Sequence, residues 1–116
     1  MRILNSLEDI DMFIKDNSVT ILYFSSLKCG VCTTVLLKIK EIINEYSNLK
    51  IGKIEIDEVK EAIGRFNVFT IPCILVFFQE KEIIRQARFI NIKEFKEKLN
   101  RFYKLIVSNG GIKYES

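Results

Sequence analysis

The apolar residues of this chain recur with two different spacings, one typical of buried strands and the other typical of amphipathic helices. The segment 19–24 is β-branched and aromatic without strict alternation, which predicts a central strand covered on both faces. From 29 to about 46, Val35, Ile39 and Ile42 recur at helical spacing among Lys and Glu residues. The chain therefore predicts a buried strand followed by a long amphipathic helix.

Start and stop signals extend this pattern over the rest of the chain. Ser6 has Asp9 at the capping-box spacing, which predicts the start of a first helix. Asn91 and Glu94 predict the start of a last helix in the same way, and Asn67 is suited to the left-handed conformation common after a helix. The expected elements are, in chain order, strand 2–4, helix 7–15, strand 19–24, helix 29–46, strand 50–57, helix 58–66, strand 73–79, strand 83–89 and helix 92–108.

This order of elements predicts an α/β protein. Strand–helix–strand units demand parallel strands joined by right-handed crossovers, and the hairpin with its turn at 80–82 adds antiparallel strands. The expected architecture is a central mixed β-sheet, β-α-β-α-β-α-β-β-α in chain order, flanked by helices on both faces. A chain of 116 residues allows one domain with one core, which we place at 1–108, followed by a short C-terminal tail at 109–116.

Composition and charge narrow the function classes. Hydrophobic residues make up 48% and charged residues 28% of the chain, as in ordinary globular proteins, and the net charge of +3 is too small to indicate nucleic acid by itself. Basic residues outnumber acidic ones toward the C-terminus. We interpret them as a solvated surface, with a patch for an acidic partner as the alternative and no nucleic-acid motif beside them. The basic residues concerned are Arg85, Arg88, Lys93, Lys96, Lys98, Arg101 and Lys104.

The N-terminal stretch, the longest apolar run and the number of cysteines indicate the cellular compartment. Acidic residues at Glu8, Asp9 and Asp11 interrupt the stretch where a signal peptide needs an apolar run, and the longest apolar run, 71–78, is too short to span a membrane. Three cysteines cannot form a complete disulfide framework. We therefore expect a cytoplasmic protein with no membrane or nucleic-acid partner.

The candidate chemistry lies in Cys29-Gly30-Val31-Cys32, between the predicted strand and helix. A free thiol is mostly protonated at neutral pH, whereas the thiolate is the nucleophile. At a helix N-terminus, backbone N–H groups and the helix dipole stabilise the thiolate of Cys29, and Lys28 adds positive potential. Cys32, one turn into the helix, is expected to be more buried. Cys29 would then attack a disulfide, Cys32 would resolve the mixed disulfide, and Gly30 would keep the approach open.

These features together resemble the thioredoxin family over essentially the whole chain. The resemblance rests on the Cys-Gly-Val-Cys motif after a strand, on Thr70-Ile71-Pro72 before a hairpin, and on the order of the elements. It implies that the Ile71–Pro72 bond is cis, that it packs beside the sulfurs, and that the backbone of Ile71 pairs with a bound substrate chain.

The motif departs from the family at the positions that tune it. The family usually has Trp before the first cysteine and Pro between the two, where this chain has Lys28 and Val31. The family's buried Asp, six residues before the first cysteine, corresponds to Tyr23, a poor base at neutral pH. The companion lysine is kept at Lys53, and Glu55 lies on the same strand face. We therefore expect Cys32 to attack more slowly than in the family, or with the help of water.

A third cysteine, Cys73, directly follows the proline. We interpret it as a small buried residue at the start of a strand. Two alternatives stay open: a third thiol that captures or regulates the disulfide between Cys29 and Cys32, and a third metal ligand. A metal site is disfavoured because zinc and iron–sulfur clusters usually take four protein ligands and the chain has no His.

We therefore interpret the chain as a thiol–disulfide oxidoreductase that reduces protein disulfides through Cys29 and Cys32. The pair itself is the redox centre, so no separate cofactor and no metal is expected. The partners would be disulfide-containing proteins and an electron donor reductase that the sequence does not identify, and the protein would act as a monomer. The alternative is a thioredoxin-fold interaction module whose cysteines are vestigial or bind a metal.

Overall fold

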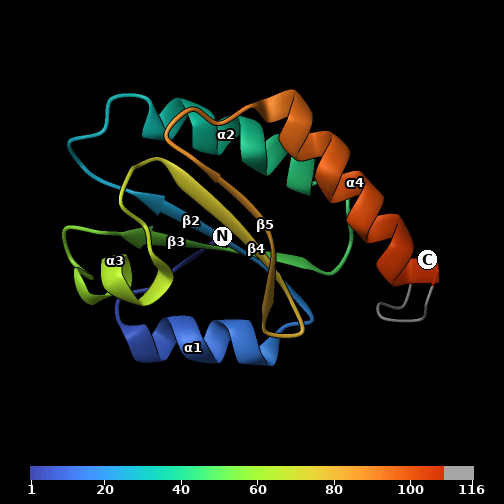
Figure 1. Ribbon diagram of the computed structural model, residues 1–116, viewed down its shortest axis with the longest axis horizontal. Coiled ribbons are helices and arrows are strands. Elements are labelled where there is room, and N and C mark those ends of the chain that lie inside the picture. The colour runs from blue at the N-terminus through green and yellow to red at the C-terminus, as the bar shows by residue number, and fades with distance from the viewer. Residues whose placement is uncertain (109–116) are drawn as a thin grey trace.

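The structure, a computed structural model, describes residues 1–108; the predicted tail at 109–116 lies outside the described residues. Strands and helices follow the predicted order (Figure 1). They are β1 (Arg2–Ile3), α1 (Leu7–Asp16), β2 (Val19–Ser25), α2 (Cys32–Ile43), β3 (Leu49–Glu55), α3 (Glu61–Phe66), β4 (Cys73–Phe78), β5 (Lys81–Ala87) and α4 (Ile92–Ser108).

The strands form one mixed sheet in the order β1-β3-β2-β4-β5. Strands β1, β3 and β2 are parallel, β4 runs antiparallel to β2, and β5 completes an antiparallel hairpin with β4. All seven residues of β2 are buried, as its continuous apolar pattern predicts. The mixed sheet and the central position of β2 are thus confirmed.

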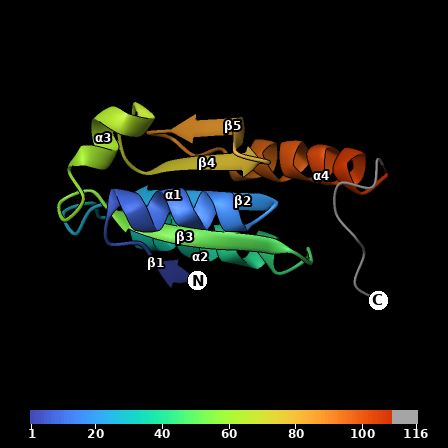
Figure 2. The ribbon, with the colours of Figure 1, turned by 90° about the horizontal axis from the view of Figure 1, so that it is seen from below.

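Helices cover both faces of this sheet, and each face has its own hydrophobic core. Helices α2 and α4 lie on one face and α1 and α3 on the other, so that in Figure 2 α1 lies in front of the sheet and α2 behind it. Successive strand residues point to opposite faces. Ile21 and Ile74 pack in the core under α2 and α4, whereas Leu22 and Leu75 pack in the core under α1 and α3.

The predicted caps are present. The Ser6 side-chain oxygen accepts a hydrogen bond from the backbone N–H of Asp9 at 3.0 Å. At the start of α4 the Asn91 side-chain oxygen accepts one from the backbone N–H of Glu94 at 2.9 Å. Asn67 adopts the left-handed conformation after α3, with φ of 54°. Local sequence therefore determines where these helices begin or end.

Several predicted boundaries are wrong by two or three residues: α2 ends at Ile43, β3 at Glu55 and β5 at Ala87 rather than at 46, 57 and 89. Three further boundaries have a cause in the local backbone. The hairpin turn lies at Gln79 and Glu80 rather than at 80–82, because both residues take positive φ (47° and 68°) and close a two-residue turn. Helix α3 begins at Glu61 rather than at 58, since the backbone N–H groups of Glu58 and Val59 bond to the carbonyl of Glu55 in a turn. The third boundary, the start of α2, belongs to the functional site.

Candidate active site

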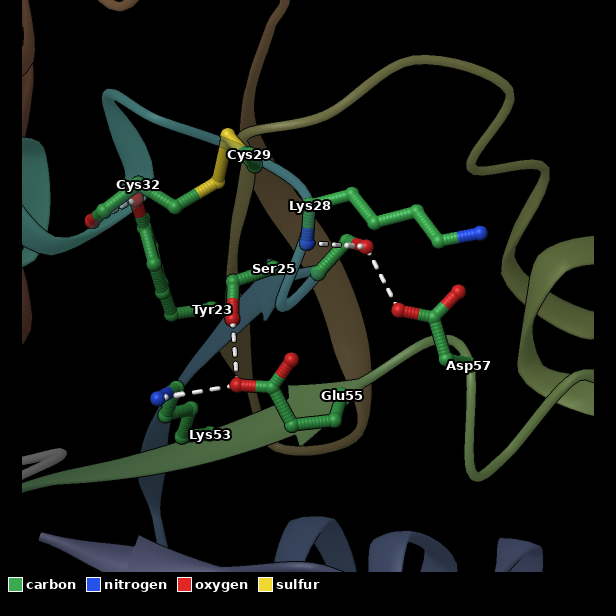
Figure 3. Close-up of a disulfide and its surroundings, with 9 residues drawn as sticks. Tyr23, Ser25, Lys28, Cys29, Cys32, Lys53, Glu55 and Asp57 are labelled. Atoms are coloured by element: carbon green, nitrogen blue, oxygen red, sulfur yellow. Dashed lines mark hydrogen bonds and ion pairs between the residues drawn. A yellow bond between two sulfur atoms is a disulfide. The ribbon is translucent and has the colours of Figure 1, made fainter.

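The two cysteines of the motif lie at the end of the sheet where β2 passes into α2 (Figure 3). They form a disulfide with Cα atoms 5.5 Å apart. Helix α2 begins at Cys32 and not at Cys29 as predicted, because the chain first turns out of β2. In that turn the N–H of Cys29 bonds to the carbonyl of Ser26 and the N–H of Cys32 to the carbonyl of Cys29. Cys32 is therefore the first residue of the helix rather than one turn inside it.

The two sulfur-bearing residues differ in access. Cys32 is only 3% exposed and belongs to the core under α2 and α4, whereas Cys29 is half-buried at the edge of that core. Gly30 and Val31 between them are exposed, and a Cβ added at Gly30 would meet no atom of the described residues within 4 Å. A bulky disulfide can therefore reach Cys29 more readily than Cys32.

The loop before the motif is held by side chains that the sequence analysis did not single out. The Ser26 hydroxyl accepts a hydrogen bond from the backbone N–H of Lys28 at 3.2 Å and donates one to the Asp57 carboxylate. In Figure 3 the Lys28 side chain extends away from the disulfide, on the side of Asp57. In the sequence, the two adjacent serines Ser25 and Ser26 at the end of β2 are the signal that could have pointed to this loop support.

Beneath the motif, Tyr23 occupies the position where the family has a buried Asp. Its ring is fully buried and its hydroxyl donates a hydrogen bond to the backbone carbonyl of Cys32 at 2.7 Å. Burial, with a contribution from the charge of Glu55, raises the pKa of Tyr23 to about 12. Tyr23 therefore holds the first turn of α2 in place, and its hydroxyl stays protonated over the pH range in which thiols ionise.

An ion pair from the neighbouring strand lies beside Tyr23. The parallel register of β2 and β3 sets Tyr23 opposite Lys53 and Ser25 opposite Glu55. The Lys53 ammonium nitrogen is 2.9 Å from Oε1 of Glu55, and the Ser25 hydroxyl donates a hydrogen bond to the same oxygen at 2.8 Å. Lys53 and Glu55, which the sequence places on the same strand face, thus form an ion pair on the α2 side of the sheet.

A small cavity joins this ion pair to the disulfide. It measures about 110 Å³, and its lining includes Cys29, Cys32, Lys53 and Glu55. That volume is enough for water. The tertiary structure therefore brings both the lysine and the carboxylate to the motif, which the sequence left open.

The proline after α3 completes this end of the sheet. The Ile71–Pro72 bond is cis, as the resemblance implies, and Pro72 is buried while Ile71 is half-buried. Since Phe24 pairs with Cys73, the first residue of β4, Pro72 lies just before that strand, at the end of the sheet where β2 leads into the cysteine loop. The backbone N–H of Arg88 donates a hydrogen bond to the carbonyl of Pro72 at 2.9 Å.

Cys73 lies on the other face of the sheet from the disulfide. It is a free thiol, fully buried in the core under α1 and α3. Burial raises the pKa of the Cys73 thiol to about 11, although Arg85 opposes the shift. The side chain thus has the surroundings of a core residue and is separated from the motif by the sheet.

Cys73 should therefore resist alkylation in the folded protein. After mild reduction at pH 8, iodoacetamide should modify two cysteines, while Cys73 reacts about a hundredfold more slowly because it is protonated and inaccessible. Intact-mass measurement would count the adducts, and the same reaction in guanidinium chloride, where all three should react, is the control. A rapid third adduct without denaturant would contradict this placement.

Two properties of the described part of the chain bear on other functions. Within residues 1–108, no three or more Cys, His, Asp or Glu side chains are grouped in a way that could hold a metal ion. No helix among the same residues has the length and apolar character needed to cross a membrane.

Comparisons with known proteins agree with this geometry. The family model described as Thioredoxin matches residues 4–104. Thioredoxin-like protein YdfQ of Bacillus subtilis is 39% identical over 102 residues, which cover 88% of this chain and 91% of that protein. The thioredoxin of Chlamydia pneumoniae is 29% identical over 89 residues, covering 77% of this chain and 83% of that protein.

Solved structures show the same fold. The thioredoxin of Plasmodium falciparum superposes with a TM-score of 0.79 at 22% identity and covers 88% of this chain and 99% of its own. Thioredoxin O2 of Arabidopsis thaliana, solved in its oxidised state, gives the same score and identity and covers 88% of this chain and 93% of its own.

Proposed function

This chain belongs to the thioredoxin family of thiol–disulfide oxidoreductases, and we propose that it reduces disulfide bonds of protein substrates through Cys29 and Cys32. The observation that carries the proposal is the difference in access between the paired cysteines, one half-buried and the other 3% exposed. A redox pair that takes its substrate from solvent needs one accessible sulfur, and it needs a second sulfur close enough to release the product.

The reaction proceeds by two thiol–disulfide exchanges. The Cys29 thiolate attacks one sulfur of the substrate disulfide, which forms a mixed disulfide and releases the first substrate thiolate. Cys32 then gives up its proton and attacks the sulfur of Cys29, which forms the intramolecular disulfide and releases the second thiolate. The substrate gains two electrons, and the Cys29–Cys32 pair loses them.

Exposed apolar residues in and near the cysteine loop support the proposal that the substrates are proteins. Leu27, Val31, Phe69 and Phe89 are exposed large apolar residues. Leu27 and Val31 lie in the cysteine loop, and Phe69 lies three positions before the cis proline. The residue before Phe89 bonds through its backbone N–H to Pro72. Exposed apolar groups are typical of protein-binding surfaces, and these residues would offer the contact area that Trp provides in the family.

Repeated turnover requires a two-electron donor that reduces the Cys29–Cys32 disulfide again. We propose a dithiol or a reductase as this donor, and a reducing cytoplasm as the compartment, with the protein acting as a monomer. A donor that keeps the pair as a dithiol in such a compartment would set the direction of the reaction toward reduction of substrates.

Reduction of insulin with dithiothreitol as the donor tests this function. The protein should accelerate precipitation of the insulin B chain about tenfold or more over dithiothreitol alone. Protein whose reduced cysteines have been alkylated is the control and should give the uncatalysed rate. No acceleration, together with stoichiometric zinc or iron in elemental analysis, would instead support an interaction module with metal-binding cysteines.

A further inference from the structure

The carboxylate of Glu55 is placed unusually for a strand residue. Its side chain is 13% exposed, although it carries a charge. One oxygen, Oε1, is occupied by Lys53 and Ser25. The other, Oε2, is buried and has no hydrogen-bond partner among the described residues. A buried acceptor oxygen is costly to leave unpaired, so Oε2 is suited to accept a hydrogen bond or a proton from a group in the adjoining cavity.

The cavity that Glu55 lines is also lined by the two cysteines of the motif. Among the described residues that line it, Glu55 alone carries a carboxylate, and Cys29 and Cys32 belong to the same lining. In the view of Figure 3 the carboxylate lies below the disulfide, with Ser25 between them. The side chain of Glu55 therefore faces the space into which Cys32 releases its proton.

The other titratable groups around Glu55 are unsuited to accept that proton. Tyr23 on β2 is itself protonated and donates its hydrogen bond to the Cys32 carbonyl. Lys53 on β3 is an ammonium donor with no lone pair to offer. Cys29, in the loop, is the sulfur under attack. The carboxylate is the remaining acceptor in the cavity.

We propose that Glu55 accepts the proton of the Cys32 thiol when Cys32 attacks the mixed disulfide, a role that rests on the proposed function. The proton moves from Cys32 to the carboxylate, directly or through water in the cavity. The Cys32 sulfur bonds to that of Cys29, and the substrate leaves as a thiolate. An ordinary carboxylate is a weaker base than a thiolate, so the transfer accompanies S–S bond formation, during which the sulfur loses its basicity.

Two neighbours support this role through position. Lys53 and Ser25 hold Oε1 and so orient Oε2, which makes them positioning residues rather than catalytic ones. The family has its buried acid on the strand that leads to the motif. In this chain Tyr23 occupies that position. The carboxylate is instead that of Glu55 on β3, which pairs with Ser25 of β2. The same cavity is thus supplied with a carboxylate from the adjacent strand.

Ellman's reagent separates the two exchanges in one stopped-flow experiment. With fully reduced protein, the first coloured thiolate reports attack by Cys29, and the second reports attack by Cys32 on the mixed disulfide. Glu55→Gln should slow the second phase about tenfold or more at pH 7 and leave the first within about twofold. The difference should shrink as pH rises, because the Cys32 thiol then ionises without a base.

Glu58→Gln, the same change at an exposed glutamate three residues along, is the matched control and should leave both phases unchanged. Glu55→Asp withdraws the carboxylate by one methylene. It should slow the second phase by a smaller factor, and it takes the place of Glu55→Gln if that variant does not fold.

An unchanged second phase at pH 7 in both Glu55 variants, or slowing by the same factor at every pH, would overturn the role of Glu55. The proposed function would survive either result. A wild-type protein that releases no second thiolate would instead remove the proposed function, and the role of Glu55 with it.

Discussion

Replacing Cys29 by serine should abolish disulfide reduction. In the insulin assay, the rate with Cys29→Ser should lose the whole catalysed acceleration, about tenfold or more, and fall to that of dithiothreitol alone. A serine hydroxyl does not ionise near neutral pH, and it cannot form the mixed disulfide that the reaction requires. The half-buried position of Cys29 makes it the one sulfur of the pair that a substrate can reach.

Cys73→Ala is the matched control for this loss. Cys73 lies on the other face of the sheet from the disulfide, so its removal should leave the insulin-reduction rate close to that of wild type. Urea unfolding of both variants would show whether either substitution alters stability. Substantial activity in folded Cys29→Ser, or its loss in folded Cys73→Ala, would contradict the assignment of the nucleophile.

Replacing Cys32 by serine should stop the reaction one step later. The Cys29 thiolate remains, so it should attack a disulfide within about threefold of the wild-type rate and then stay in the mixed disulfide. Multiple turnover should fall about a hundredfold or more, since release depends on an external thiol. The 3% exposure of Cys32 supports this division, because a sulfur so buried attacks its neighbour and not a passing substrate.

The trapped species can be measured directly. Incubation of reduced Cys32→Ser with a small disulfide should give an adduct of one substrate half per protein by non-reducing mass spectrometry, and added dithiothreitol should remove it. Wild type under the same conditions should show the intramolecular disulfide instead. A Cys32→Ser protein that forms no adduct, while Cys29 remains alkylatable, would reverse the assigned order of attack.

Much of the fold could be predicted because its determinants are local. The Ser6 cap and the left-handed Asn67 follow from the side chains at those positions, and the buried β2 follows from its own composition. The start of α2 was predicted wrongly because residues after β2 have helical spacing but are held in a turn by bonds to Ser26. The spacing of apolar residues does not distinguish such a turn from the first turn of a helix.

The sulfurs of the site could be predicted from the motif, and the proline, Tyr23 and Lys53 from the resemblance. The spacing of Cys29 and Cys32 is a local property, and the cis bond before Pro72 followed from the resemblance. The face on which Cys73 lies could not be predicted, since a shift of strand register by one residue reverses every side chain. In the structure, Cys73 pairs with Phe24 and points into the core under α1 and α3.

By itself, then, the sequence determined the order of strands and helices and the two sulfurs of the reaction, because these depend on residues close together in the chain. The tertiary structure decided what surrounds the sulfurs. The register of β2 with β3 brings Lys53 and Glu55 into the cavity beside Cys32, and the Tyr23 hydroxyl reaches the Cys32 carbonyl. These contacts join residues distant in sequence, and no local pattern encodes them.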